Sequence, residues 1–194
     1  MRTGSRLLFF ATAIGLAACS SQESALVRDG QHPAAVVPKR QPQVSLLRRK
    51  VVSLLEKKNY RQAIEMMNGR NREGLEREYI LAVNGLLEAG NDAFSSGDYA
   101  AAARAFKGVL NAYPAEPSLR DRISHDPKRI KVLLEACVNR MMEQGLEEYR
   151  RGNLKSAIRK WKALLAISPG HQEAKKALDT ATVQLQTLQR MQDR

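Results

Sequence analysis

The three residue types of a hydrolytic triad stand side by side in this chain, as Ser124, His125 and Asp126. A nucleophile, its base and the group that orients the base normally converge from separate segments, which three successive residues of a loop cannot do. The other histidines, His32 and His171, are far away, and the sequence has no HExxH or comparable ligand spacing, CxxC pair or phosphate-binding glycine loop. We therefore expect no enzyme, no metal site and no cofactor.

The two cysteines differ in their surroundings. Cys137 lies in the apolar run VLLEACVNRMM, where we expect a small buried helix residue and not a nucleophile. Cys19 follows a basic start (MRTGSR), an apolar run and the small residues Ala17 and Ala18. This order resembles the lipobox of bacterial lipoproteins, in which the cysteine becomes the first mature residue and is acylated. The alternative is an ordinary signal peptide with an incidental cysteine.

The lipobox resemblance implies a signal peptide over residues 1–18, a lipidated Cys19 and a place in the bacterial cell envelope. The apolar run is too short for a bilayer-spanning helix, which needs about 20 residues, whereas acyl chains anchor a protein without one. Ser20, where a retained lipoprotein would have aspartate, implies the outer membrane facing the periplasm. Residues 20–43 hold three prolines and no sustained period, so we expect residues 19–43 to be a flexible tether.

Composition favours helices, because alanine and leucine dominate and aromatic residues make up only 5% of the chain. Thirty-two Lys and Arg against 20 Asp and Glu give a net charge of +12. Loss of Arg2 and Arg6 with the signal peptide leaves +10. Such an excess favours an anionic partner, whether lipid head groups, a polymer or an acidic protein face.

From Val44 onward the periodicity is helical, and one pattern occurs three times. An Asn or Asp able to cap a helix is followed after four residues by alanine and after four more by a large side chain. The small residue lets a neighbouring helix approach, and the large one fills the adjoining space. The three sets are Asn59, Ala63 and Met67; Asp98, Ala102 and Phe106; Asn153, Ala157 and Trp161.

These segments resemble tetratricopeptide repeats, which are antiparallel helix-turn-helix units. The second unit matches at Gly90, Gly97, Tyr99, Ala102, Phe106 and Pro114, the third at Gly145, Gly152, Leu154, Ala157, Trp161 and Pro169, and the first only at Tyr60, Ala63 and Met67. The period departs from the usual 34 residues, since Gly97 and Gly152 are 55 apart, and the polar stretch 115–131 holds most of the excess. We predict an all-α domain over residues 44–194, with irregular units at 44–70, 73–114 and 128–169 and a capping helix at 171–192.

Trp161 lies on one helix face with Leu154, Ile158 and Leu165. It could be a stacking platform for a base or sugar, but Phe106 at the same offset in the preceding unit favours a core role. The predicted packing residues are Gly90, Ala102, Phe106, Gly145, Ala157 and Trp161.

The repeat resemblance implies a groove lined by the first helix of each pair, in which a partner's peptide or helix is held. Asn and Arg side chains can bond a peptide backbone or carboxylate, and the apolar ones supply contact area. The alternative is that some of these residues pack against the inserted stretch 115–131. The implied lining is Asn84, Leu87, Asn91 and Phe94 from one unit and Met142, Leu146, Tyr149 and Arg150 from the next.

A basic face on the helix of the third unit comprises Lys155, Arg159 and Lys162, and further clusters lie at 48–50 and 128–131. These cations could bind phosphates or anionic lipid, or simply be a solvated face. Near an anionic membrane each would contribute about 1 kcal/mol of attraction.

We therefore expect a lipid-anchored adaptor that binds an envelope protein through its groove and the membrane through its acylated N-terminus, and we expect no nucleic acid partner. Its layout resembles pilotins and assembly factors of outer-membrane or secretion machines. The alternative is a binder of an anionic envelope polymer, such as lipopolysaccharide or peptidoglycan, which rising salt would release. An enzyme, or a regulator of one, is a third reading.

Overall fold

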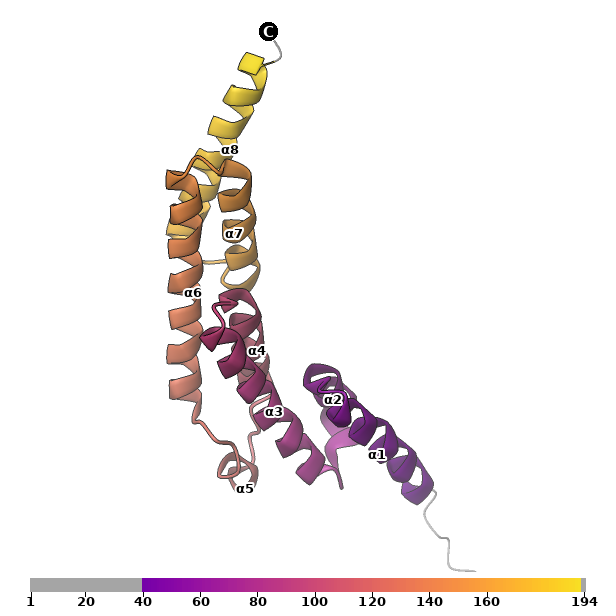
Figure 1. Cartoon of the computed structure of the whole chain (residues 1–194). Coiled ribbons are helices and arrows are strands. Elements are labelled where there is room, and N and C mark those ends of the chain that lie inside the picture. Colours follow the sequence, from indigo (N-terminus) through magenta and orange to yellow (C-terminus); the bar gives the residue numbers. More distant parts are fainter. Residues whose placement is uncertain (1–39, 193–194) are drawn as a thin grey trace, which may run out of the picture. The chain divides into compact units, whose positions relative to one another are not determined.

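The computed structural model describes residues 40–192 of the chain (Figure 1), and in that range it is helical with no strand. The predicted all-α fold is confirmed. The predicted signal peptide, Cys19 and the tether up to residue 39 lie outside the described residues. The helices are α1 (Arg40–Glu56), α2 (Tyr60–Met66), α3 (Glu76–Ser95), α4 (Tyr99–Asn111), α5 (Pro117–Arg120), α6 (Pro127–Arg150), α7 (Leu154–Ile167) and α8 (Gln172–Gln192), with a 3-10 turn at Gly69–Arg72.

The helices pair in chain order, as α1 with α2, α3 with α4 and α6 with α7, and α8 packs on α7. Residues 57–59, 96–98 and 151–153 form the three turns within pairs, each of the same length. Helix α3 also packs on α2, and α4 packs on both α6 and α7. The structure therefore consists of helical pairs joined through their neighbours, and α1 begins four residues before the predicted start at Val44. None of the described helices has the length and apolar character needed to cross a membrane.

Each of these turns needs one residue in the left-handed region. Gly97 (φ 82°) and Gly152 (φ 80°) occupy this place in two turns, and Lys58 (φ 56°) occupies it in the first. The predicted caps that follow differ from one another. The Asp98 side chain accepts from the Ala101 amide at 2.9 Å, whereas Asn59 and Asn153 make no side-chain capping bond. All three residues stand at the N-cap with similar backbone angles, but the expected side-chain bond is wrong for the two asparagines. The side chain of Asn153 instead donates to Glu148 Oε2.

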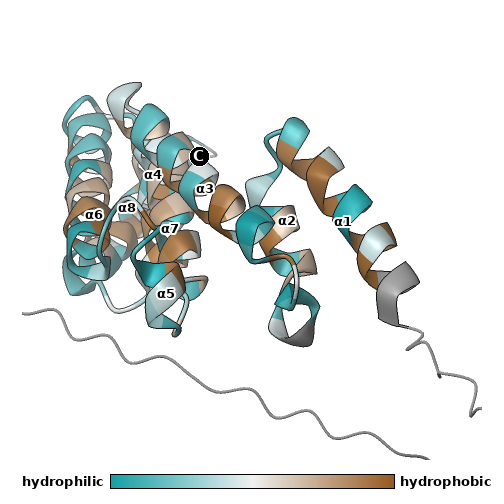
Figure 2. Ribbon diagram, turned by 90° about the horizontal axis from the view of Figure 1, so that it is seen from below, coloured by the Kyte–Doolittle hydropathy of each residue, from teal (hydrophilic) through white to brown (hydrophobic). Residues whose placement is uncertain are grey.

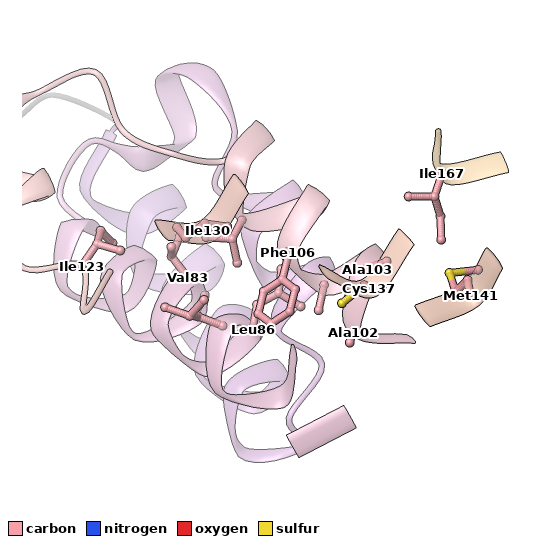
Figure 3. Packing of buried hydrophobic residues seen from close by; sticks show 14 of the residues in the cluster. Val83, Leu86, Ala102, Ala103, Phe106, Ile123, Ile130, Cys137, Met141 and Ile167 are labelled. Atoms are coloured by element: carbon pink, nitrogen blue, oxygen red, sulfur yellow. The ribbon is translucent and has the colours of Figure 1, made fainter. Parts of the chain in front are cut away.

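One hydrophobic core runs through the helical pairs. Hydrophobic and hydrophilic residues alternate along single helices such as α1 and α3 (Figure 2), as expected of helices with one buried side. Figure 3 shows Val83 and Leu86 of α3 near Phe106 of α4 and Ile130 of α6. The alanines Ala63, Ala102 and Ala157 are fully buried.

The stretch 115–131 is partly structured by its own apolar residues. Leu119 and Ile123 are buried, and Arg120 Nε donates to the carbonyl of Pro114 at 3.0 Å. The last residues of the stretch are not an insertion but the start of α6, which begins at Pro127. Part of the long spacing between units is therefore helix, because α6 has 24 residues.

Candidate partner-binding surface

The predicted groove residues of α3 are not equally accessible. Leu87 is only 1% exposed, so it belongs to the core and cannot contact a partner. That prediction is wrong because α3 packs against both α2 and α4, which buries a wider face than one stripe. Asn84, Asn91 and Phe94 are half-buried.

Asn84 is held by the chain's own segment 122–124. Its Nδ2 donates to the carbonyl of Arg122 at 2.9 Å, and its Oδ1 accepts from the amide of Ser124 at 3.0 Å and from the Ser124 hydroxyl at 2.9 Å. The amide side chain thus bonds a backbone carbonyl and a backbone N–H two residues apart. For Asn84 the alternative of packing against the inserted stretch holds.

Asn91 lies seven residues after Asn84, two turns along the same face of α3. Within the described residues it has no hydrogen-bond partner. Phe94 packs edge-on against Tyr99, with ring centroids 5.3 Å apart. An amide and an aromatic edge therefore adjoin each other near the end of α3.

On α6, the predicted groove residues combine core contact with exposure. Met142, Leu146 and Tyr149 are half-buried and pack against the core, and Arg150 is exposed. The ring centroid of Tyr149 lies 6.0 Å from that of Trp161. Each of the three apolar residues leaves part of its surface open to a partner.

The six predicted packing residues are all buried, and the structure brings glycines and large rings together in pairs. A Cβ added to Gly90 would lie 2.8 Å from Cε1 of Phe106, and one added to Gly145 would overlap the indole of Trp161. Trp161 is 1% exposed, so the stacking-platform reading is wrong.

Ser124, His125 and Asp126 each make contacts that support the fold and do not form a triad with one another. Ser124 bonds Asn84, and Asp126 caps α6 by accepting from the amides of Lys128 and Arg129. These amide bonds lower the pKa of the Asp126 carboxyl. The carbonyl of His125 accepts from the Tyr113 hydroxyl at 3.3 Å.

Cys137 is fully buried, and burial raises the pKa of its thiol to about 11. At neutral pH this thiol is protonated, which removes the thiolate that a nucleophile or metal ligand needs. The part of the chain covered by the structure holds no group of three or more His, Cys, Asp or Glu residues placed to bind a metal ion.

A shallow cleft of about 410 Å³ opens between the second and third helical pairs, and the sequence did not predict it. Lys160 Nζ donates to Gln144 Oε1 at 3.3 Å, and Gln144 Nε2 lies 3.5 Å from the carbonyl of Gly97. The cleft arises where the 96–98 turn approaches α6 and α7, residues distant in the sequence, so no local pattern indicates it. Its lining includes Gly97, Tyr99, Met141, Gln144 and Lys160.

The basic face of α7 points to solvent. Lys155, Arg159 and Lys162 are exposed, and none forms an ion pair with any residue from 40 to 192. They are available to an anionic partner, or to water alone.

No family model, curated protein or solved structure matches the chain.

Proposed function

We propose that this protein is a lipid-anchored adaptor of the bacterial cell envelope. It is a helical-repeat domain of the tetratricopeptide kind that holds a partner protein at the membrane and catalyses nothing. The repeat assignment is supported by the same glycine-to-ring contact in two successive pairs, Gly90 with Phe106 and Gly145 with Trp161. Such stacks commonly present a face on which peptide segments bind.

The observation that carries the proposal is the way Asn84 holds residues 122–124. Its side chain bonds one carbonyl and one amide of an irregular backbone segment, which is how an adaptor can grip a peptide independently of its side chains. Asn91 presents the same group two turns further along α3, half-buried and unengaged by the described residues. We infer that Asn91 bonds the backbone of a partner as Asn84 bonds the chain itself.

The other predicted groove residues, on α3 and α6, indicate what the partner segment contains. Phe94, Met142 and Leu146 offer partly exposed apolar surface, which suits apolar side chains. The exposed guanidinium of Arg150 can bond a carboxylate bidentately. The expected ligand is therefore a non-helical peptide segment with apolar residues and an acidic group.

Affinity capture from native membranes tests the proposal. The intact lipoprotein is compared with Asn91→Ala and with Met142→Ser, two changes that should leave the fold intact because both positions are partly exposed. We expect a single prominent partner whose recovery falls about fivefold or more in each variant, as loss of one hydrogen bond or apolar contact of about 1 kcal/mol implies. Lys155→Ala/Lys162→Ala on α7 is the matched control and should retain the partner. Unchanged recovery of the partner by the α3 and α6 variants would contradict binding through the groove.

The anchor is tested separately. A Cys19→Ser chain should leave the membrane fraction in part or be left unprocessed, which mass spectrometry of the N-terminus distinguishes. A mature N-terminus at residue 19 without acyl chains in the unmodified protein would contradict the lipoprotein assignment.

One observation favours the alternative of a binder of anionic envelope polymers. Helix α7 carries Lys155, Arg159, Lys160 and Lys162 and no acidic residue. Binding of this kind falls steeply with ionic strength, whereas apolar contacts in the groove resist salt. Partner recovery at about 0.5 M salt, where screening is strong, therefore separates the two functions.

A further inference from the structure

The positive charge of the chain is concentrated in its first helical pair. Residues 40–72 contain nine Lys and Arg and two Glu, a net charge of +7. Residues 73–192, more than three times as long, contain 18 Lys and Arg and 15 Asp and Glu, a net charge of +3. An anionic surface would therefore be attracted chiefly to α1, α2 and the turn that follows them.

Some of these charges form one stripe along α1 and on Lys57, the residue that follows it. Residues 46, 49, 50, 53 and 57 follow one another at helical spacing and share a face. Arg49, Lys50 and Lys57 are exposed, and Leu46, about one turn before Arg49 and Lys50, keeps 52% of its surface exposed. The single acidic residue of α1, Glu56, lies at the edge of this face and at the end of the helix. We call Leu46, Arg49, Lys50, Ser53 and Lys57 the α1 stripe.

The cations of the stripe are not used within the described part of the protein. Arg49, Lys50 and Lys57 form no ion pair there, whereas three arginines of the same region are engaged by the fold. These are Arg48 with Glu78 at 2.9 Å, Arg61 with the carbonyl of Arg104 at 2.8 Å, and Arg72 with Glu116. The three engaged arginines contribute contacts that stabilise the fold. The cations of the stripe make no such contact within the described residues, so fold stability does not explain why they are there.

Beside the stripe an open depression of about 430 Å³ separates α1 from α2. Arg49 and Lys50 stand at its edge, and the side chains of Leu54 and Met66 contribute apolar surface to it. Cations next to partly exposed apolar groups can contact the phosphates and the outer acyl region of an anionic membrane together.

We propose that the α1 stripe rests on an anionic lipid bilayer, with Arg49, Lys50 and Lys57 on lipid phosphates and Leu46 at the interface. The cations favour an anionic surface. The exposed Leu46 favours a bilayer over a soluble polymer, because a bilayer offers apolar acyl chains that the Leu46 side chain can contact and a hydrophilic polymer does not. The position of α1 agrees, because only 20 residues lie between Cys19 and Arg40, so the start of α1 can be no further than about 75 Å from an acylated Cys19. The inference rests on the proposed envelope location, but on neither the partner groove nor the acyl chains.

Vesicle flotation of the chain Ser20–Arg194 tests this second attachment. That chain lacks the leader and any acyl group but keeps residues 38–194, a compact unit with its own core. Phosphatidylcholine vesicles with 30 mol% phosphatidylglycerol are compared with phosphatidylcholine alone. The variants are Arg49→Gln/Lys50→Gln/Lys57→Gln in the stripe and, as a control of equal charge change, Lys155→Gln/Arg159→Gln/Lys162→Gln on α7. Circular dichroism checks that both remain folded.

We expect binding to the anionic vesicles only, and a loss of at least about 30-fold in the partition coefficient for the stripe variant, given the attraction of each basic side chain to such a surface. The α7 variant should lose no more than about threefold through the change in net charge. Leu46→Ser should weaken vesicle binding several-fold. The binding that remains should depend more strongly on salt than that of the unmodified chain.

Equal losses in the two triple variants would overturn the proposal, since net charge alone would then explain binding. An unaffected Leu46→Ser variant would also overturn it, as would displacement of the protein from vesicles by millimolar inorganic phosphate or a short DNA duplex, which would assign the stripe to soluble anions. None of these outcomes bears on partner capture by the groove.

Discussion

At the scale of single residues, the architecture depends on glycines that face rings. Gly145 lies in the middle of α6, where alanine would normally stabilise a helix by about 1 kcal/mol. Alanine does not fit at position 145, because its Cβ would lie 2.7 Å from Cδ1 of Trp161 and overlap the rest of the indole. The Trp161 side chain is only 1% exposed, so it would have to shift within the core.

Gly145→Ala should therefore lower the free energy of unfolding by about 1–2 kcal/mol, the cost of overpacking less the gain in helix propensity. Urea denaturation followed by circular dichroism measures it. Gly108→Ala is the helical control and should be close to neutral, because its nearest neighbours are the flexible ends of Leu86 and Arg61, at 3.1 and 3.4 Å. In a Trp161→Leu background the cost of Gly145→Ala should largely vanish. A neutral or stabilising Gly145→Ala would contradict the packing described here.

At the scale of helices, one difference between units arises at their starts. Asp98 caps α4 through the Ala101 amide, whereas the Asn153 side chain donates to Glu148 Oε2 at 3.1 Å and leaves the first amides of α7 uncapped.

Asp98→Ala should cost about 1 kcal/mol of stability and Asn153→Ala only a few tenths. Thermal and urea unfolding of the two variants, made in the same background, provide the comparison. Losses of equal size would mean that α7 is capped by Asn153 after all.

The helical pairs could be predicted from local sequence patterns, whereas the solvent exposure of particular side chains could not. Spacing of caps, alanines and large residues indicated the helical pairs because these signals lie within one or two turns of each other. The burial of Leu87 depends on two neighbouring helices packing against α3, and the engagement of Asn84 depends on a segment about 40 residues away. Such contacts have no local signal in the sequence.

The same limit applies to the candidate surface. Of the eight predicted groove residues, Leu87 is buried and Asn84 is bonded to the chain's own segment 122–124. The other six remain partly or largely exposed. The cleft lined by Met141, Gln144 and Lys160 had no sequence signal, because the turn and the two helices that form it meet only in the folded chain.

At the scale of the whole molecule, the two proposed binding surfaces lie on different helices. We propose that the faces of α3 and α6 near Asn91 and Met142 bind the partner and that the α1 stripe contacts the membrane. The acylated Cys19 would keep the partner at the membrane, and the α1 stripe would add a second attachment that holds the domain against the bilayer. Because the surfaces lie on different helical pairs, a variant in one should leave the other intact.

Site-specific photocrosslinking in the native envelope tests partner binding most directly. A photoreactive amino acid replaces Met142 on α6 or, as the outer-face control, Lys162 on α7. We expect one strong crosslinked protein from position 142, lost when Asn91→Ala is added, and little or none from position 162. Crosslinks from position 162 alone, or the same products from both positions, would contradict it.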